Sequence, residues 1–230
     1  MTDLDEMAET FFREGCVLVP GALAPELVDA LRQKTDECAA DPTIDKRHLS
    51  WVGDTFVLRR CQEIDAIFDE LTRHPEILRC AEAILGNGAA FNAMNVIRNG
   101  TGQAISRWHV DDTLEFPLPP DIPRFDARLR MPVLWLTVQV ALSDIDGIEN
   151  GPTQFVPGSH YSGRYPPEGK EEPQFEGRPP YAMLCKAGDI YLFNHQTWHR
   201  GAPNTSERTR YVLQIQYAKR WANARFRGLA

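Results

Sequence analysis

The chain has few of the features that mark secreted, zinc-binding or membrane-spanning proteins. Its five cysteines are widely spaced and odd in number, and they contain no CxxC pair. This pattern argues against a disulfide framework and a cysteine-ligated zinc site, and it favours a reducing compartment. The acidic N-terminus lacks the apolar stretch of a signal peptide, and no run elsewhere approaches the length that spans a bilayer. We therefore expect a soluble, cytoplasmic protein without a membrane partner.

Basic residues are too scattered to indicate a nucleic-acid surface. The formal net charge is -7, and no run of Lys and Arg is interleaved with aromatic residues. The basic C-terminal end, with Lys219, Arg220, Arg225 and Arg227, is interpreted as a solvated tail or a subunit contact. We expect a small-molecule substrate and no nucleic acid, and a homo-oligomer stays open.

With 230 residues the chain is long enough for one domain that encloses a cavity, and we predict a single domain over residues 1–230. Residues 1–88 show mainly helical spacing of apolar side chains, whereas residues 89–220 show short strand-like runs separated by turns. This order predicts an α+β protein, with helices added to an all-β core that forms a sandwich or a jelly roll. The predicted helices are the first dozen residues, 25–38, 64–71 and 77–85, and the predicted strands are 90–97, 104–109, 132–142, 153–156, 181–185, 189–193 and 209–218.

Two stretches are predicted as loops. The stretch 41–50 is polar, and the segment 164–180 is rich in Pro and Glu. The longer segment fits an excursion over the surface, either a mobile lid or a disordered insert.

Two predicted strands have one apolar and one polar face. Leu136 and Val138 share the apolar face of 132–142, and Leu213 and Ile215 share that of 209–218. If helices cover the apolar faces, the polar faces point into the barrel and line a ligand cavity. The alternative is that they meet water, and periodicity does not separate the two. The polar faces carry Thr137 and Gln139 in one strand and Arg208, Arg210, Gln214 and Gln216 in the other.

Two histidines and one aspartate form the candidate metal site. His109 and Asp111 stand two residues apart, so on a strand their side chains leave the same face. A second histidine, His199, precedes a turn-forming Gly-Ala-Pro-Asn stretch far along the chain. Two histidines and one carboxylate are the ligand set of non-haem Fe(II) oxygenases, which leaves adjacent iron positions open for a chelating co-substrate and O2.

Five motifs occur in order with the spacing of one known family. They are Trp108-His109-Val110-Asp111, the run 142–152 with the sequence LSDIDGIENGP, Val156-Pro157-Gly158-Ser159-His160, Ala187-Gly188-Asp189, and Trp198-His199-Arg200-Gly201 followed by an Arg-bearing strand. Together they resemble the phytanoyl-CoA dioxygenase family of Fe(II)/2-oxoglutarate oxygenases, over nearly the whole chain. The resemblance implies a double-stranded β-helix, a cupin-like jelly roll, with helices packed on one face.

The resemblance also implies a role for individual residues. His109, Asp111 and His199 are the expected Fe(II) ligands, and Arg210 is expected to hold the distal carboxylate of 2-oxoglutarate, because a guanidinium offers two parallel donors. Arg208 is the rival of Arg210, which is preferred for its spacing from His199. Further expected contacts of the co-substrate are Met94, Thr137, Gln139 and Arg98.

The activity implied by the resemblance is oxidation of a C–H bond in a small organic molecule, coupled to conversion of 2-oxoglutarate and O2 into succinate and CO2. Because Asp111 is present where related halogenases carry Ala or Gly, hydroxylation is favoured, although desaturation, epoxidation and ring closure share the same ligands. A jelly-roll protein that binds a metal or ligand without turnover, or a cupin enzyme that uses Zn(II), Mn(II) or Ni(II) without 2-oxoglutarate, remains an alternative. Candidate substrate-pocket residues are Trp51, Phe56, Arg59 and Trp135.

Three other polar residues near the motifs receive no ligand role. His160 is interpreted as a structural residue that hydrogen-bonds a loop. His195 precedes His199 by one helical turn, but it follows a strand-like run and no HExxH Glu is present, so packing beside the site is expected. Asp112 is interpreted as a solvated neighbour that a shifted strand register would exchange with Asp111.

Overall fold

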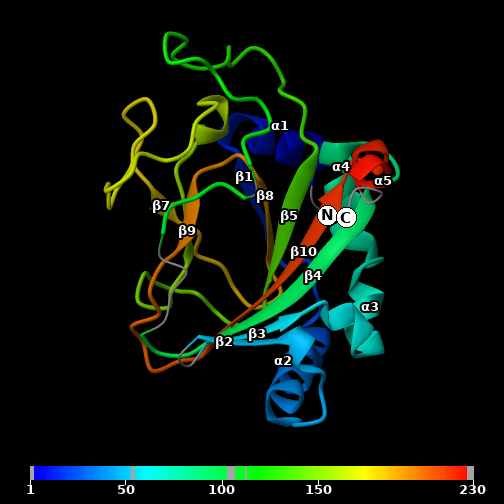
Figure 1. Ribbon diagram of the computed structural model, residues 1–230. Coiled ribbons are helices and arrows are strands. Elements are labelled where there is room, and N and C mark those ends of the chain that lie inside the picture. Colours follow the sequence, from blue (N-terminus) through cyan, green and yellow to red (C-terminus); the bar gives the residue numbers. More distant parts are fainter. Residues whose placement is uncertain (1–2, 53–54, 103–106, 112, 227–230) are drawn as a thin grey trace.

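The computed structural model describes residues 3–52, 55–102, 107–111 and 113–226. Two antiparallel sheets face each other, and helices cover the outer face of the larger sheet (Figure 1). The large sheet has the strand order β1 (Cys16–Val19), β8 (Ile190–Asn194), β5 (Trp135–Ala141), β10 (Arg210–Ala218), β4 (Ala90–Asn99), β3 (Thr55–Arg59) and β2 (Leu49–Val52). The small sheet has the order β7 (Tyr181–Ala182), β6 (Thr153–Phe155) and β9 (His199–Gly201).

The helices begin and end where local sequence signals place them. In α1 (Leu4–Glu14) the side chain of Asp3 accepts hydrogen bonds from two backbone amides of the first turn, and Gly15 ends the helix with φ 84°. Both α2 (Pro25–Ala40) and α4 (Pro75–Leu85) start with a proline, which lacks the amide hydrogen that a first turn leaves unpaired. The remaining helices are α3 (Ala66–Leu71) and α5 (Arg220–Phe226), and short 3-10 turns cover Lys46–His48, Cys61–Glu63 and Ser159–Tyr161.

The main core lies between the helices and the large sheet. Val138 of β5 and Ile215 of β10 are directly opposed and fully buried, and they pack with side chains of α1 and α4. Their polar neighbours in the strands, Thr137 and Gln139, are 1% and 4% exposed on the other face. These polar side chains of β5 are therefore inside the protein, between the two sheets, and do not meet water. On the matching face of β10, Gln214 and Gln216 are half-buried.

Several strands differ from the sequence prediction. The β2–β3 hairpin was not predicted, because its first strand begins in the polar stretch 41–50. Phe56 and Leu58 of its second strand are buried in the main core. Of the predicted strand 104–109, residues 104–106 lie outside the described residues, and His109 forms only an isolated bridge with His199. Strand β7 has only two residues of the predicted strand 181–185. Strand β9 was not predicted, because its three residues are too few to show the alternation of a strand.

The segment 164–180 covers the outer face of the small sheet. Phe175 packs against Trp198 with ring centroids 6.0 Å apart, and the indole of Trp198 donates a hydrogen bond to the Arg164 carbonyl. The indole of Trp108 donates to the Glu171 carbonyl. These contacts show that the segment packs on the small sheet, whereas lid motion stays a prediction.

The C-terminal end also differs from its prediction. The expected tail forms helix α5 over Arg220–Phe226, and Arg227 lies outside the described residues. Throughout the described ranges, no helix combines the length and apolar character needed to cross a membrane.

Candidate active site

His109, Asp111 and His199 converge between the two sheets. One ligand atom from each residue lies within 4.8 Å of the others. The Nε2 atoms of His109 and His199 are 3.8 and 3.6 Å from Oδ1 of Asp111. The bridge between residues 109 and 199 places the two imidazoles side by side, with ring centroids 4.2 Å apart. The structure thus brings together the three residues that the sequence singled out.

Backbone carbonyls fix the orientation of both imidazoles. Nδ1 of His109 lies 2.8 Å from the Arg107 carbonyl, and Nδ1 of His199 lies 2.9 Å from the Thr197 carbonyl. Because a carbonyl only accepts, each Nδ1 carries the hydrogen and each Nε2 presents a lone pair toward Asp111. This tautomer is the one that a metal held through Nε2 requires.

The charge states also suit a cation. Burial raises the pKa of Asp111, but the interaction of its carboxylate with the protonated forms of the neighbouring imidazoles, His199 first, lowers it by more, and the net pKa falls to about 2. Burial, and then the proximity of His199, lowers the pKa of His109. A carboxylate beside neutral imidazole is the protonation state that binds a divalent metal.

His195 lies beside this ligand set. Its Nε2 is 3.8 Å from Oδ2 of Asp111 and 3.0 Å from the hydroxyl of Thr137. Its backbone carbonyl accepts a 2.8 Å hydrogen bond from the amide of Asp111. The backbone of His195 therefore orients Asp111, and its imidazole packs beside the carboxylate, as expected for a residue that packs beside the site.

A buried polar cluster lies next to the triad and contains Arg210. The guanidinium is 8% exposed, and its Nη2 donates a 3.2 Å hydrogen bond to the hydroxyl of Thr153. That hydroxyl is 2.9 Å from the Tyr191 hydroxyl and donates to Oε1 of Gln139 at 3.2 Å. Nε of Arg210 is buried and finds no hydrogen-bond partner within the part of the chain that the structure describes. An unpaired buried guanidinium nitrogen is costly, and an anionic ligand would satisfy it.

The sequence reasoning missed two members of this cluster, Thr153 and Tyr191. Both fall on predicted strands, and Tyr191 alternates with its apolar neighbours Ile190 and Leu192. A buried tyrosine usually needs a partner for its hydroxyl, so its presence in an apolar run was a usable signal. Thr153 gave none, because its role depends on β6 facing β10 across the two sheets.

Known proteins resemble this chain in sequence and in fold. Residues 11–212 match the model of the phytanoyl-CoA dioxygenase family. The chain belongs to this family. Among its relatives, the dioxygenase olcK of Penicillium canescens is 24% identical over 225 residues, which cover 92% of this chain and 69% of the relative. The uncharacterised protein Rv1501 of Mycobacterium tuberculosis is 23% identical over 220 residues, which cover 95% and 76%.

Solved structures share the fold. The α-ketoglutarate dependent epimerase SnoN from nogalamycin biosynthesis superposes with a TM-score of 0.72 at 23% identity, covering 94% of this chain and 82% of SnoN. HygX from Streptomyces hygroscopicus, with nickel and 2-oxoglutarate bound, has a TM-score of 0.73 at 16% identity, covering 96% and 88%. These likenesses confirm the predicted jelly-roll fold with helices on one face.

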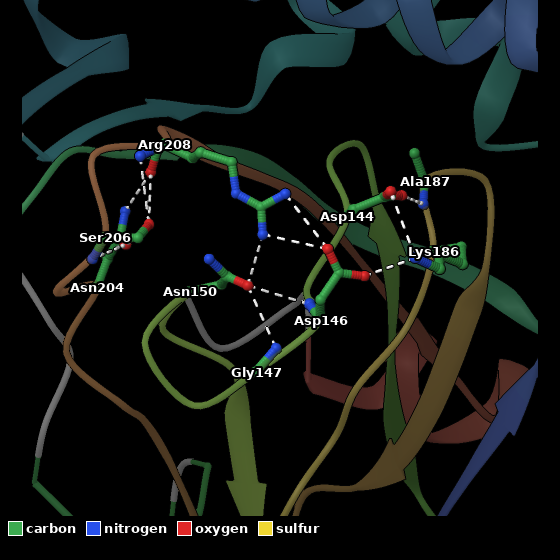
Figure 2. A network of polar contacts seen from close by, with 9 residues as sticks. All are labelled: Asp144, Asp146, Gly147, Asn150, Lys186, Ala187, Asn204, Ser206 and Arg208. Atoms are coloured by element: carbon green, nitrogen blue, oxygen red, sulfur yellow. Dashed lines mark hydrogen bonds and ion pairs between the residues drawn. The ribbon is translucent and has the colours of Figure 1, made fainter.

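Within this member of the phytanoyl-CoA dioxygenase family, Arg208 pairs with residues of a neighbouring loop. Figure 2 shows its guanidinium directed at Asp146 and Asn150. Nη2 lies 3.2 Å from the Asp146 carboxylate and 2.7 Å from Oδ1 of Asn150, and Lys186 pairs with the same carboxylate. Arg208 connects its own loop to the loop that carries Asp146 and Asn150, whereas Arg210 lies in the buried cluster.

Two expected co-substrate contacts are corrected. Met94 is directly opposite Ile215 and is fully buried in the core on the helix side. Arg98 is opposite Tyr211 on the same side and forms an ion pair of 2.9 Å with Asp36 of α2. Because side chains alternate along a strand, both residues point away from the cavity. The cavity face of β4 instead carries the residues of opposite parity, Ala93, Asn95, Ile97 and Asn99.

The expected substrate-pocket residues divide in the same way. Phe56 belongs to the core on the helix side, and the exposed ring of Trp51 stacks on it with centroids 4.8 Å apart. Neither side chain points into the space between the sheets, so the prediction that these two residues line the substrate pocket is wrong. Arg59 is opposite Asn95, and Trp135 shares the parity of Thr137, so these two project from the cavity face. The residue Asp112 lies outside the described residues.

Proposed function

We propose that this protein is an Fe(II)- and 2-oxoglutarate-dependent dioxygenase that hydroxylates a C–H bond of a small organic molecule and releases succinate and CO2. The observation that carries the proposal is that two sites lie between the same two sheets. One is a triad of two imidazoles and a carboxylate, and the other is a buried polar cluster in which Nε of Arg210 has no hydrogen-bond partner among the described residues.

Each site supplies what one component would need. His109, Asp111 and His199 would hold the metal from one side and leave its other positions open. Arg210 would pair with the distal carboxylate of 2-oxoglutarate, next to the hydroxyls of Thr153 and Tyr191. When bound, Fe(II) with 2-oxoglutarate and O2 supplies an oxidant strong enough for an unactivated C–H bond.

Buried Arg210 favours this proposal over a protein that binds metal without 2-oxoglutarate. Burying a guanidinium away from water is costly unless an anion compensates it. No acidic side chain pairs with Arg210 among the residues that the structure describes. A metal-binding protein or a cupin enzyme without 2-oxoglutarate has no use for such a residue, so its burial supports a site for a carboxylate-bearing co-substrate.

The test is an anaerobic titration of metal-free protein with Fe(II) and 2-oxoglutarate, followed by the weak visible charge-transfer band of the chelate. We expect a band in wild-type protein, loss of the band in Asp111→Ala, and a requirement for much more 2-oxoglutarate in Arg210→Ala. Arg208→Ala is the matched control and should resemble wild type. A folded wild-type protein without a band would contradict the proposal and favour the alternatives without 2-oxoglutarate.

The type of oxidation needs a separate measurement. SnoN is described as an epimerase and SnoK, which has a TM-score of 0.69 with this chain, as a carbocyclase, so this fold serves several outcomes. With a substrate in hand, mass spectrometry sorts the outcomes into three groups, and NMR of the product separates the members of a group. Hydroxylation or epoxidation adds one oxygen atom, ring closure or desaturation removes two hydrogen atoms, and epimerisation leaves the mass unchanged. We expect the added oxygen, and labelled O2 should be its source.

A further inference from the structure

A row of five side chains crosses the cavity face of the large sheet. Strand register places Tyr191, Gln139, Gln214, Asn95 and Arg59 directly opposite one another on β8, β5, β10, β4 and β3. Opposed residues of antiparallel strands project from the same face. Because Gln139 contributes to the buried cluster around Arg210, the whole row faces the space between the sheets.

Solvent access increases along this row from one end to the other. Tyr191 is fully buried and Gln139 is 4% exposed, whereas Gln214 and Asn95 are half-buried and Arg59 is exposed. On the other face of β4 and β3 the side chains are packed in the core. The row therefore runs from the buried cluster around Arg210, on β8 and β5, to the solvent-exposed end of β3, the strand next to the edge strand β2 (Figure 1).

The three outer residues of the row have unused hydrogen-bonding capacity within the described part of the chain. The side-chain amide of Gln214 makes no hydrogen bond there. The side chain of Asn95 only accepts a long hydrogen bond of 3.4 Å from the backbone amide of Arg60. The guanidinium of Arg59 has no carboxylate partner in the same ranges, whereas the next residue, Arg60, pairs with Glu63. Half-buried amides and a free guanidinium suit a ligand that brings its own acceptors and a negative charge.

We propose that Arg59, Asn95 and Gln214 form the substrate subsite, here called the amide row, and that it selects an anionic small molecule. The anionic group, a carboxylate or a phosphate, pairs with Arg59, and polar atoms nearer the triad pair with Asn95 and Gln214. The inference rests on the proposed function, because it assigns the rest of the cavity to the substrate of that reaction.

The row also sets the length of the substrate. Arg59 and Gln139 are separated by three strand spacings, which is about 14 Å. The anionic group therefore lies at the opposite end of the molecule from the carbon that reacts. The next residues on the same face, Ile97 and Val57, are half-buried and apolar, so they suit the hydrocarbon part between the two ends.

Ligand-observed NMR tests the amide row without a known substrate. The probes are small carboxylic acids, each with its primary amide, and small phosphate monoesters, each with its parent alcohol. Saturation transfer from metal-free protein reports binding alone. Broadening of the probe signals by Mn(II), added with 2-oxoglutarate, reports whether the bound probe lies near the triad.

Wild-type protein should prefer the charged probes by about tenfold, the worth of one charge-assisted contact. Arg59→Gln should abolish the preference, and Arg60→Gln, the neighbouring arginine, should keep it. Gln214→Leu should weaken both members of each pair. No preference in wild type, a preference that Arg59→Gln retains, or charged probes that bound Mn(II) fails to broaden would each overturn the proposal. A preference that depends on Arg59 in protein that binds no Mn(II) would overturn the proposed function and leave the amide row as an anion site.

Discussion

The guanidinium of Arg210, on the large sheet, donates a hydrogen bond of 3.2 Å to the hydroxyl of Thr153, on the small sheet. This contact joins the two sheets. The Thr153 hydroxyl is also shared with Gln139 and Tyr191. Nε of Arg210 is buried and unpaired among the residues that the structure describes. The cluster is thus pre-formed around one cationic group.

Arg210→Ala should weaken binding of 2-oxoglutarate by roughly 10- to 100-fold, because a hydrogen bond to a charged group contributes about 1.5–3 kcal/mol. Arg208→Ala removes a guanidinium two residues away whose partners are Asp146 and Asn150 (Figure 2). It should change the affinity by less than about threefold, since exposed ion pairs contribute little. Isothermal titration of the metal-loaded variants measures both values, and equal losses would remove the distinction between the two arginines.

Thr137→Val keeps the shape of a buried side chain and removes the hydroxyl that lies 3.0 Å from Nε2 of His195. Because His195 orients Asp111, we expect metal affinity to fall about tenfold, as is usual when a residue that orients a ligand is lost. Competition with a metal-binding dye measures this affinity. Thr72→Val is the control, since its hydroxyl bonds the Asp69 carbonyl away from the triad. Equal metal affinity in wild type and Thr137→Val would show that the hydroxyl does not act through His195.

Sequence periodicity predicted the strands that pack on the helices but not the exact face of each residue in β4. Leu136, Val138 and Ile215 alternate with polar residues, and the structure confirms which face is core. In β4, by contrast, the cavity face is open and mixed, with Ile97 beside Asn95. The family resemblance alone placed Met94 among the co-substrate contacts, whereas the structure places it on the core face.

The candidate metal site was predictable in part because its residues are local and chemically distinctive. His109 and Asp111 lie two residues apart, and His199 stands in a family-like motif. The short strand β9, which carries His199, was not predictable, because three residues show no period. Nor were the partners of Arg210, since Thr153 reaches it only when the two sheets face each other.

His160 should make the stability of the fold depend on pH. Burial lowers the pKa of its imidazole to about 4 from 6.5, although a hydrogen bond from Nε2 to the Phe12 carbonyl acts the other way. Between these two values the unfolded chain binds the proton and the folded chain does not. The contribution of His160 to the free energy of unfolding is therefore fully present above pH 6.5. It decreases as the pH falls toward 4, by about 3 kcal/mol in total.

Urea unfolding at a series of pH values measures this decrease. In His160→Gln the amide can still donate to the Phe12 carbonyl but does not titrate, so this variant should lose the His160 part of the pH slope. Its stability at pH 7 serves as its own reference, which separates the slope from any loss of packing. An identical slope in wild type and variant would assign the pH dependence to other groups.

Gly15 connects α1 to β1 in a conformation that only glycine fits, with φ 84° and with His160 Nδ1 2.6 Å from the place where a Cβ would lie. Its carbonyl accepts a 2.9 Å hydrogen bond from the Thr197 hydroxyl, two residues before His199. Gly15→Ala should therefore lower the free energy of unfolding by about 2 kcal/mol or more and also weaken metal binding.

Gly21→Ala is the matched control: its φ is 62°, but nothing lies within 4 Å of the added carbon. It should lose about 1 kcal/mol from backbone strain alone and keep its metal affinity. Urea unfolding measures the stability of the two variants, and metal titration measures their metal affinity. Equal metal affinity in Gly15→Ala and Gly21→Ala would show that crowding at Gly15 does not displace His199.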